Sequence, residues 1–311
     1  MELIRGLHNL KPAHRGCAAT IGNFDGVHRG HLAVLDRLRE RATEMDLPDT
    51  VITFEPTPQE YFAPEQAPAR LSRLREKLGI FREHGVDRVL CLRFNRELAE
   101  LEADAFIQRI LIDGLGVRYL VVGDDFRFGK GRKGDFSLLQ RAGEAHDFPV
   151  VATSTFSEAG GRVSSTRVRE ALAAGELDVA VQLLGRPYCI SGRVAPGERR
   201  GRSIGFPTAN IHLHRVATPL RGVFAVRMLG VAERPVPGVA NLGTRPTVDG
   251  RRLVLEVHLF DFDCDIYGRH VDVEFVRRLR DEKKFDSFAA LKEQIQLDAQ
   301  AARSVFAVTD E

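Results

Sequence analysis

The pattern of hydrophobic positions changes once along the chain, near residue 184. Before this point, short apolar segments alternate with segments whose apolar residues recur every three or four positions. The apolar segments are CAATIGNF (17–24), TVITF (50–54), RVLCLRF (88–94) and RYLVVG (118–123), and the helical patterns follow His31 and cover 71–84 and 103–111. Strands that alternate with helices are typical of an α/β fold with a doubly wound parallel sheet.

After Leu184, apolar and polar residues alternate between turns rich in glycine and proline. The alternating segments are GVFAVRML (222–229), LVLEVHLFDF (253–262) and HVDVEF (270–275), and a helical pattern follows over 287–306. This order predicts a small antiparallel β-barrel or sandwich with a C-terminal helix. We therefore expect two domains, 1–185 and 186–311, joined near LLGRPY (183–188).

Composition adds few constraints to this picture. The 311 residues are 43% hydrophobic and 28% charged, a balance typical of globular proteins. The net charge of +2 gives no reason to expect a nucleic-acid or membrane partner. The chain has neither a signal-peptide pattern nor an apolar run of membrane-spanning length, and its four cysteines form no C-x-x-C pair. We expect a cytoplasmic enzyme without a zinc site or a disulfide framework.

The segment GNFDGVHRGH (22–31) joins the first predicted strand to the first predicted helix. Ligands of open α/β sheets bind at the carboxyl ends of strands, and a helix N-terminus favours phosphate. His28 and His31 share one helix face, and Gly30 between them leaves room for a phosphate. Imidazole donors there would stabilise the charge that develops on an α-phosphate as pyrophosphate leaves. The alternative is a helix cap at His28 and a surface histidine at His31.

Two further segments of the first half suit phosphate chemistry. In GDDFRFGKGRKGD (123–135), Asp124 and Asp125 suit Mg²⁺ or a ribose, and the basic residues that follow suit phosphates. VSSTRVREALAAG (163–175) opens a helix with hydroxyl groups and two arginines. Both segments are also compatible with solvated, purely structural roles.

The second half contains GRVAPGERRGRSIGFPTANI (192–211). Its glycines allow the backbone to fold closely over phosphates, although ordinary β-turns remain an alternative. Thr208 and Asn210 alternate on an extended segment and offer oxygen ligands that suit Mg²⁺. Glu256 lies in an otherwise apolar strand. A carboxylate inside a barrel is costly unless it is used or paired, but the alternation also permits Glu256 and His258 on the outer face.

Together these motifs resemble the bacterial bifunctional riboflavin kinase/FAD synthetases over almost the whole chain. GNFDGVHRGH resembles the family's adenylate-binding signature, SSTRVR its second phosphate motif, and GFPTAN the riboflavin kinase signature. The resemblance implies a Rossmann-like nucleotidyltransferase domain followed by a six-stranded β-barrel with a C-terminal helix. It also implies ATP-dependent phosphorylation of riboflavin to FMN in the barrel and adenylyl transfer from ATP to FMN in the first domain, with Mg²⁺ as cofactor.

The resemblance also implies roles for individual residues. His28, His31 and Glu256 would be catalytic, Glu256 as the base of the kinase, and Thr208 and Asn210 would bind Mg²⁺. The expected flavin contacts are Asp125, Arg280 and Phe285. The expected ATP contacts are Gly22, Phe24, Gly30, Ser164, Ser165, Thr166, Arg169, Gly192, Arg200, Gly201 and Gly205.

The chain departs from the family pattern at three positions. Thr57 replaces a histidine, Pro196 stands where histidine is commoner, and Phe224 replaces the usual tyrosine. Three other classes of protein share some of these features. A different nucleotidyltransferase would not explain GFPTAN, an aminoacyl-tRNA synthetase would need a K-M-S-K-S loop, and one half could instead be a non-catalytic flavin-binding module. The expected partners are riboflavin, FMN and ATP, while formation of a homo-oligomer is left open.

Overall fold

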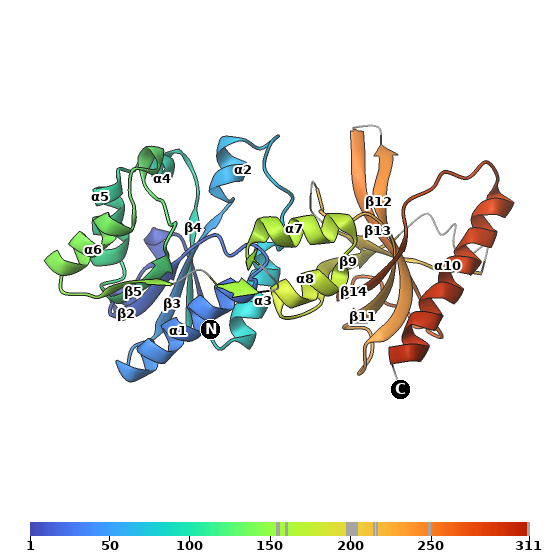
Figure 1. Cartoon of the computed structure of the whole chain (residues 1–311), viewed down its shortest axis with the longest axis horizontal. Helices are drawn as coiled ribbons and strands as arrows, with labels where there is room; N and C mark the ends of the chain where they lie inside the picture. Colours follow the sequence, from blue (N-terminus) through green and yellow to red (C-terminus); the bar gives the residue numbers. More distant parts are fainter. Residues whose placement is uncertain are drawn as a thin grey trace. The chain divides into compact units, whose positions relative to one another are not determined.

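The computed structural model describes residues 1–153, 156–158, 161–196, 205–213, 215, 217–247 and 250–309 (Figure 1). The chain forms two compact units. One consists of Met1–Pro68 with Ser72–Ser164, and the other of Ala69–Leu71 with Ser165–Glu311. The domain limits 1–185 and 186–311 remain predictions.

The first unit is built on a six-stranded parallel sheet with the strand order β1-β4-β3-β2-β5-β6. Four of its strands lie at the predicted segments, which confirms the parallel α/β architecture. The two edge strands, β1 and β6, were not predicted from the sequence. The strands are β1 (Glu2–Arg5), β2 (Cys17–Ile21), β3 (Asp49–Glu55), β4 (Arg88–Arg93), β5 (Val117–Gly123) and β6 (Val150–Thr153).

Helices cover both faces of this sheet. On one face, α1 (Arg29–Glu44) and α3 (Leu74–Glu83) bury Leu38 and Phe81 against the strands. On the other, α5 (Ala103–Phe106), a π-helical segment (Ile107–Ile112) and α6 (Phe136–Ala145) bury Ile110 and Leu139. Because both faces are covered, every residue of β2 is buried, as is typical of a parallel sheet. Further elements of this unit include α2 (Pro58–Phe62), α4 (Arg96–Ala99) and the pair β7 (Ser157–Glu158) and β8 (Gly161–Arg162).

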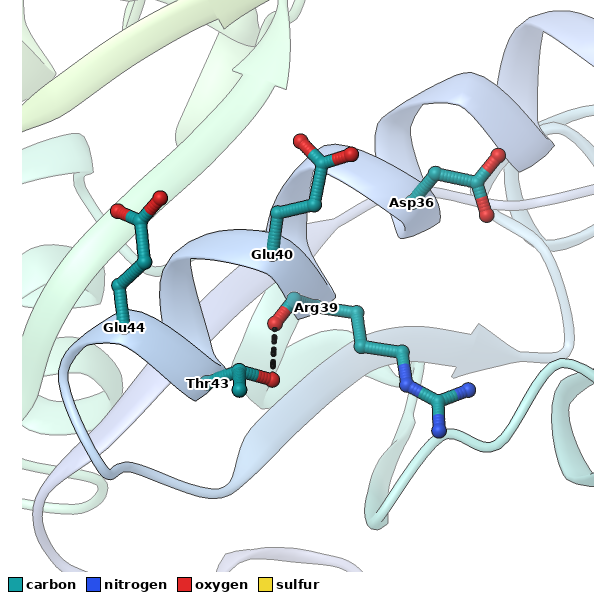
Figure 2. Close-up of a pocket in the computed structure, with 5 residues that line it drawn as sticks. All are labelled: Asp36, Arg39, Glu40, Thr43 and Glu44. Atoms are coloured by element: carbon teal, nitrogen blue, oxygen red, sulfur yellow. Dashed lines mark hydrogen bonds between the residues drawn. The ribbon is translucent and has the colours of Figure 1, made fainter.

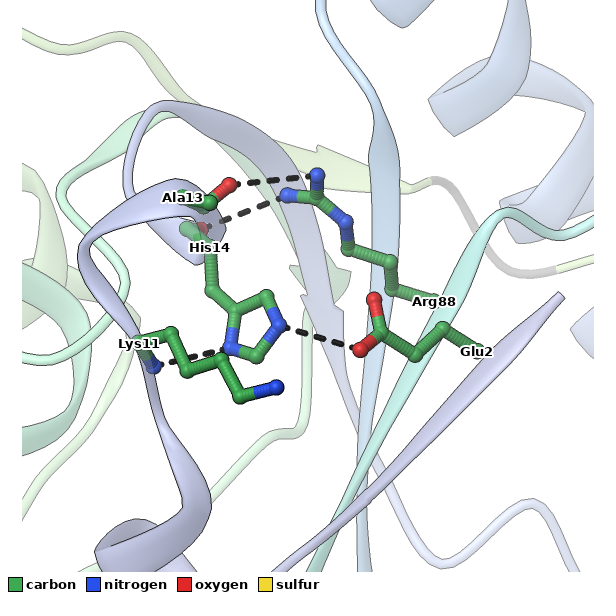
Figure 3. Close-up of polar contacts among 5 residues, drawn as sticks. All are labelled: Glu2, Lys11, Ala13, His14 and Arg88. Carbon is green, nitrogen blue, oxygen red and sulfur yellow. Dashed lines mark hydrogen bonds and ion pairs between the residues drawn. The ribbon is translucent and has the colours of Figure 1, made fainter.

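A buried histidine fixes the chain between β1 and β2. The His14 side chain accepts a hydrogen bond from the Lys11 backbone N–H at Nδ1 (3.0 Å), and its Nε2 lies 3.1 Å from a Glu2 carboxylate oxygen (Figure 3). The Arg88 guanidinium donates to the carbonyl groups of Ala13 and His14. Glu2 and Arg88 begin their strands, so this cluster lies at the amino end of the sheet.

The second unit contains a closed barrel of six antiparallel strands in the order β10-β13-β12-β11-β14-β9, as the family resemblance implied. Helices α7 (Ser165–Ala174) and α8 (Leu177–Leu184) precede it, and α10 (Phe288–Thr309) follows it. The strands are β9 (Tyr188–Ala195), β10 (Ala209–His212), β11 (Gly222–Leu229), β12 (Val236–Thr247), β13 (Gly250–Leu259) and β14 (His270–Arg280).

Buried side chains fill the barrel, and α10 lies along its outside (Figure 1). Ala302 and Phe306 of α10 pack against Ala225 and Val239. The fully buried Phe224 ring meets another buried ring, that of Phe275, edge to face at 5.2 Å. This apolar environment explains why a phenylalanine without a hydroxyl group fits where the family usually has tyrosine.

Candidate active sites

Two predicted motifs lie at the same edge of the parallel sheet. Strand β2 pairs with β3 on one side and β5 on the other, so the strand order reverses between β2 and β5. Such a switch point separates the loops that follow the two strands and is the usual ligand site of an open α/β sheet. The loop to α1 follows β2, and Asp124 and Asp125 follow β5 directly.

The two histidines form a stacked pair at the start of α1. The imidazole centroids of His28 and His31 are 3.7 Å apart, with an angle of 13° between the rings. His28 is the N-cap of α1, and its Nδ1 accepts the backbone N–H of His31 at 3.3 Å. An accepting Nδ1 places the proton of the neutral ring on Nε2, which is then a donor. The capping role and a donor role toward a ligand are therefore compatible.

Glycine at position 30 leaves room for the His28 ring. A Cβ at Gly30 would lie 3.2 Å from His28 Nδ1 and 3.3 Å from Cε1. At position 22, a Cβ would lie 3.1 Å from the Phe24 ring. Phe24 is itself buried and packs against His31 at 5.1 Å. The structure thus gives Gly22, Phe24 and Gly30 a role in shaping the loop, and their ATP contacts remain predictions.

Asp125 lies on an exposed loop and forms an ion pair. One of its carboxylate oxygens is 2.7 Å from the Arg162 guanidinium. Other basic residues in this loop also face carboxylates; for example, Arg127 lies 3.2 Å from Asp135, and Lys130 lies 2.7 Å from Glu100. The hydrogen bond and charge of Lys130 hold the pKa of the Glu100 carboxyl below its ordinary value.

An aromatic cluster that was not predicted from the sequence lies beside this edge. Tyr61 and Phe62 of α2 and Phe94 after β4 have ring centroids 5.2–5.7 Å apart. Phe62 remains 66% exposed, which is unusual for so large an apolar side chain. The adjacent aromatic residues in PQEYF (58–62) were the available signal, but their exposure depends on the fold.

Thr57 has a structural role where the family has histidine. It is the N-cap of α2, and its hydroxyl oxygen accepts the Glu60 backbone N–H at 3.4 Å. The Glu60 carboxylate in turn accepts the Thr57 backbone N–H at 3.0 Å. This reciprocal capping box stabilises the short helix that carries Tyr61 and Phe62.

In the barrel, three polar residues lie side by side on adjacent strands. Asn210 of β10 and Asn241 of β12 are the direct cross-strand neighbours of Glu256 on β13. Leu255 and Val257 are fully buried, whereas Glu256 is half-buried and lies on the opposite, outer face of the sheet. The structure therefore selects the outward orientation of Glu256. Asn241 was not expected from the sequence.

The GFPTAN segment is fixed by a neighbour of Glu256. His258 Nδ1 lies 2.8 Å from the carbonyl oxygen of Pro207, and the His258 and Phe206 rings meet edge to face at 5.0 Å. Because a carbonyl oxygen can only accept, His258 Nδ1 donates this hydrogen bond. Burial lowers the pKa of His258. Thr208 follows directly, and β10 then places Asn210 beside Glu256.

Two glycines of the second half have a clear backbone role. A Cβ at Gly192 would lie 2.4 Å from Ile211 Cγ2 and 2.8 Å from the His212 carbonyl oxygen, so the close packing of β9 on β10 requires glycine. Gly205 has φ +84°, a conformation that favours glycine. Arg200 and Gly201 lie outside the described residues.

The remaining predicted residues lie on α7 and near α10. Ser165 and Thr166 begin α7, directly after Ser164, and Arg169 donates from Nε to the Ala69 carbonyl at 2.7 Å. Arg280 contacts the buried Asp298 of α10 through two hydrogen bonds of 2.8 and 2.6 Å. The Phe285 ring centroid lies 5.8 Å from the Arg280 guanidinium carbon.

Among the described residues, we find neither a metal site made of His, Cys, Asp and Glu side chains nor a further pocket suited to a ligand. No group of three or more His, Cys, Asp or Glu residues in the described part of the chain could hold a metal ion. A pocket of about 560 Å³ lies along the later turns of α1, lined by Asp36, Arg39, Glu40, Thr43 and Glu44 (Figure 2). The side chains that line this pocket all belong to one surface of α1, and they form a charged surface that faces solvent. None of the described helices is long and apolar enough to cross a membrane.

Family models match both halves of the chain: FAD synthetase over residues 10–167 and riboflavin kinase over residues 184–306. The chain is 55% identical to the bifunctional riboflavin kinase/FMN adenylyltransferase of Escherichia coli K12, over 99% of each chain. The enzyme of the same name from Pseudomonas fluorescens is 54% identical, over 99% of this chain and 98% of that one.

A solved structure also matches the full chain. It is described as a macrolide-efflux protein from Streptococcus pneumoniae and superposes with a TM-score of 0.82 at 30% identity, over 97% of this chain and 99% of that chain. The fold, the two family models and the full-length relatives agree in both halves. The chain belongs to the bifunctional riboflavin kinase/FMN adenylyltransferase family.

Proposed function

We propose that adenylyl transfer takes place at the carboxyl edge of the parallel sheet, with the ATP phosphates bound at the start of α1. As a member of its family, the chain phosphorylates riboflavin to FMN and transfers an adenylyl group from ATP to FMN. The observation that carries the proposal is the position of the stacked His28 and His31 rings, at the N-terminus of the helix that follows the switch-point strand.

In this mechanism, an oxygen of the FMN phosphate attacks the α-phosphorus of ATP, and the bond to the pyrophosphate oxygen breaks. The attacking oxygen is already ionised, so this step needs no general base. Negative charge increases on the α-phosphate oxygens and on the leaving pyrophosphate. His28 and His31 donate hydrogen bonds to these oxygens, and the α1 N-terminus adds its partial positive charge.

The aromatic cluster suits the flavin of FMN. Tyr61 and Phe62 offer exposed rings near the edge that carries the histidines, and a planar isoalloxazine gains by stacking against such rings. Asp125, on the loop after β5, is proposed to contact the flavin nucleotide. Its ion pair with Arg162 would orient the carboxylate.

Phosphorylation of riboflavin needs a base, because the attacking group is a neutral hydroxyl. We assign this role to Glu256, which takes the proton of the terminal hydroxyl as its oxygen attacks the γ-phosphorus of ATP and ADP leaves. Asn241, the cross-strand neighbour of Glu256, is placed to orient the carboxylate.

Thr208 and Asn210 supply a hydroxyl and an amide oxygen on one short extended segment, a donor set that fits Mg²⁺. Bound there, Mg²⁺ would neutralise charge on the ATP phosphates. The His258 contact to Pro207 fixes the segment that bears both donors.

The other assignments are proposals of the same kind. ATP phosphates in the barrel are assigned to the segment from Gly192 to Gly205, which includes Arg200 and Gly201. Nucleotide phosphate is also assigned to Ser164, Ser165, Thr166 and Arg169 at the start of α7. Phe285 is assigned to riboflavin, with Arg280 supporting its ring. We also propose a domain boundary after residue 185, supported by the family matches to 10–167 and 184–306, and a cytoplasmic location.

Replacing the histidines tests the adenylyl-transfer site. His28→Ala and His31→Ala should each lower FAD formation from FMN by about 10²–10³-fold, the usual effect of losing one transition-state donor. Pyrophosphate release with ATP and FMN measures this step. Phosphorylation of riboflavin by the same proteins is the control and should be unchanged. Wild-type pyrophosphate release by both variants would refute the proposal.

A further inference from the structure

Lys77 is a fully buried lysine in the first unit. It lies in α3 and is 1% exposed, and its ammonium group donates a hydrogen bond to the backbone carbonyl of Asn23 at 3.0 Å. Burying an ammonium group is costly unless polar partners compensate for the lost water. The family resemblance assigned no role to this residue. Its partner, Asn23, lies in the loop between β2 and α1 that ends at His28.

This loop has a backbone that needs support from its surroundings. Phe24 has φ +48°, Gly26 has φ +81° and Val27 has φ +40°, all in the left-handed region. Glycine adopts this region readily, but phenylalanine and above all the β-branched valine do not. Such conformations persist only where neighbouring groups fix them, and they cluster at functional sites.

The support comes from the segment that begins α3. The Ser72 hydroxyl oxygen accepts the Gly26 backbone N–H at 2.9 Å, and the Ser72 backbone N–H donates to the Asp25 carboxylate at 3.0 Å. Lys77, one helical turn further on, holds the Asn23 carbonyl. Ser72 and Lys77 thus contact three of the five residues between Gly22 and His28.

We infer that Lys77 is a positioning residue for adenylyl transfer. Together with Ser72, it fixes the loop that precedes His28 and so determines where the His28 side chain lies. The charge of Lys77, together with the Thr53 hydroxyl that donates to the same oxygen at 3.5 Å, keeps the Asn23 carbonyl oxygen bonded within the protein. An oxygen turned toward the ligand would instead repel a triphosphate. The loop conformation in turn fixes His28 at the N-cap of α1. This inference rests on the proposed function of His28 in binding and activating ATP.

The test uses the full-length protein with Lys77→Met, which removes the charge but keeps a long side chain. Arg75→Met is the matched control, because Arg75 is an exposed cation on the same helix. We expect Lys77→Met to lower kcat/KM for FMN adenylylation by about tenfold or more, since small displacements of reacting groups have effects of this size. Riboflavin phosphorylation should change less than about twofold in both variants, within ordinary surface-substitution effects.

A double-variant comparison separates positioning from general destabilisation. If Lys77 acts through His28, adding Lys77→Met to His28→Ala should lower adenylylation by a smaller factor than adding it to the wild type. Ser72→Ala removes a different contact to the same loop. It should also lower FMN adenylylation while leaving riboflavin phosphorylation unchanged. If Lys77→Met does not fold, Ser72→Ala carries the test alone.

Three results would overturn the inference. In the first, folded Lys77→Met or Ser72→Ala adenylylates FMN as fast as Arg75→Met. In the second, a variant loses adenylylation and riboflavin phosphorylation to the same extent. In the third, the effects of Lys77→Met and His28→Ala on adenylylation are fully additive. Failure of the proposed function looks different, because His28→Ala would then retain wild-type adenylylation. An impaired His28→Ala beside an unimpaired Lys77→Met refutes only the role of Lys77.

Discussion

Gly30 and His28 depend on each other at the start of α1. The His28 ring lies over the Gly30 backbone, within 3.3 Å of where a Cβ would be, while its Nδ1 caps the helix. A glycine inside a helix normally lowers stability relative to alanine. Its presence here is explained by the space that the His28 ring needs. Helix propensity therefore favours alanine at this position, whereas the position of the His28 ring favours glycine.

Gly30→Ala should separate these two preferences. The added methyl group would displace the His28 ring, so FMN adenylylation should fall by about 10–100-fold. The gain from alanine as the better helix former is offset by the weakened His28 cap on the His31 backbone N–H, so the net change in stability should stay within about 1 kcal/mol. Steady-state adenylylation and thermal unfolding measure the two effects.

Gly79→Ala is the matched control for this substitution. Gly79 lies inside α3, and nothing lies within 4 Å of where its Cβ would be. The control should gain stability without losing activity. Full adenylylation by Gly30→Ala would show that the His28 ring can move without consequence, contrary to the site described here.

The sequence located the residues whose chemistry stands out, but not those whose role depends on burial. His28, His31 and Gly30 were found because their spacing follows a strand and opens a helix. Lys77 was missed, although it lies between Leu74, Leu78 and Phe81 on the apolar stripe of α3, which was the available signal. A single lysine in a charged helix is normally expected to face water, and only the fold shows that it does not.

At the level of elements, the buried strands could be predicted because their hydrophobic signal is continuous. β2, β3, β4 and β5 coincide with the predicted segments to within a few residues. β12 was missed because Pro237, Gly238 and Gly243 interrupt its alternation. Glu256 could not be oriented from the sequence, since the same alternation fits an inward or an outward carboxylate until the strand register is known.

A buried ion pair attaches the C-terminal helix to the barrel. Arg280 of β14 binds both carboxylate oxygens of Asp298, which also accepts a hydrogen bond from Gln294 at 2.9 Å. Removing one partner of a buried pair leaves the other charge uncompensated. The helix and the loop that carries Phe285 should therefore depend on this contact.

Asp298→Asn keeps the shape of the side chain and removes its charge. We expect it to weaken the attachment of α10 by about 3 kcal/mol, the lower end of the range for a broken buried pair. Hydrogen exchange in peptides from residues 288–309 should become faster, while FMN adenylylation stays at the wild-type level. The matched control is Asp261→Asn, because Asp261 pairs with Arg303 of the same helix but its side chain is 80% exposed. Unchanged exchange in Asp298→Asn would show that apolar packing alone holds the helix.

At the scale of the whole molecule, the two units use different chemical groups for their two reactions, adenylyl transfer and riboflavin phosphorylation. The first unit offers donors at a helix N-terminus, which suits attack by an ionised phosphate oxygen. The second offers a carboxylate between two asparagines on a barrel surface, which suits attack by a hydroxyl that must lose a proton. The central claim is that each reaction depends on its own set of residues.

The most direct measurement of this claim follows the products formed from riboflavin or FMN with ATP and Mg²⁺, using His28→Ala, Glu256→Gln and their mixture. Glu256→Gln removes the base but keeps the size of the side chain, so the kinase rate should fall by about 10²–10⁴-fold. This variant should still convert supplied FMN to FAD, and His28→Ala should convert riboflavin to FMN but form little FAD. The mixture should make FAD from riboflavin, because each protein supplies the reaction that the other lacks. Loss of both reactions in either variant, or wild-type FMN formation by Glu256→Gln, would contradict the assignment of the two reactions to two separate sites.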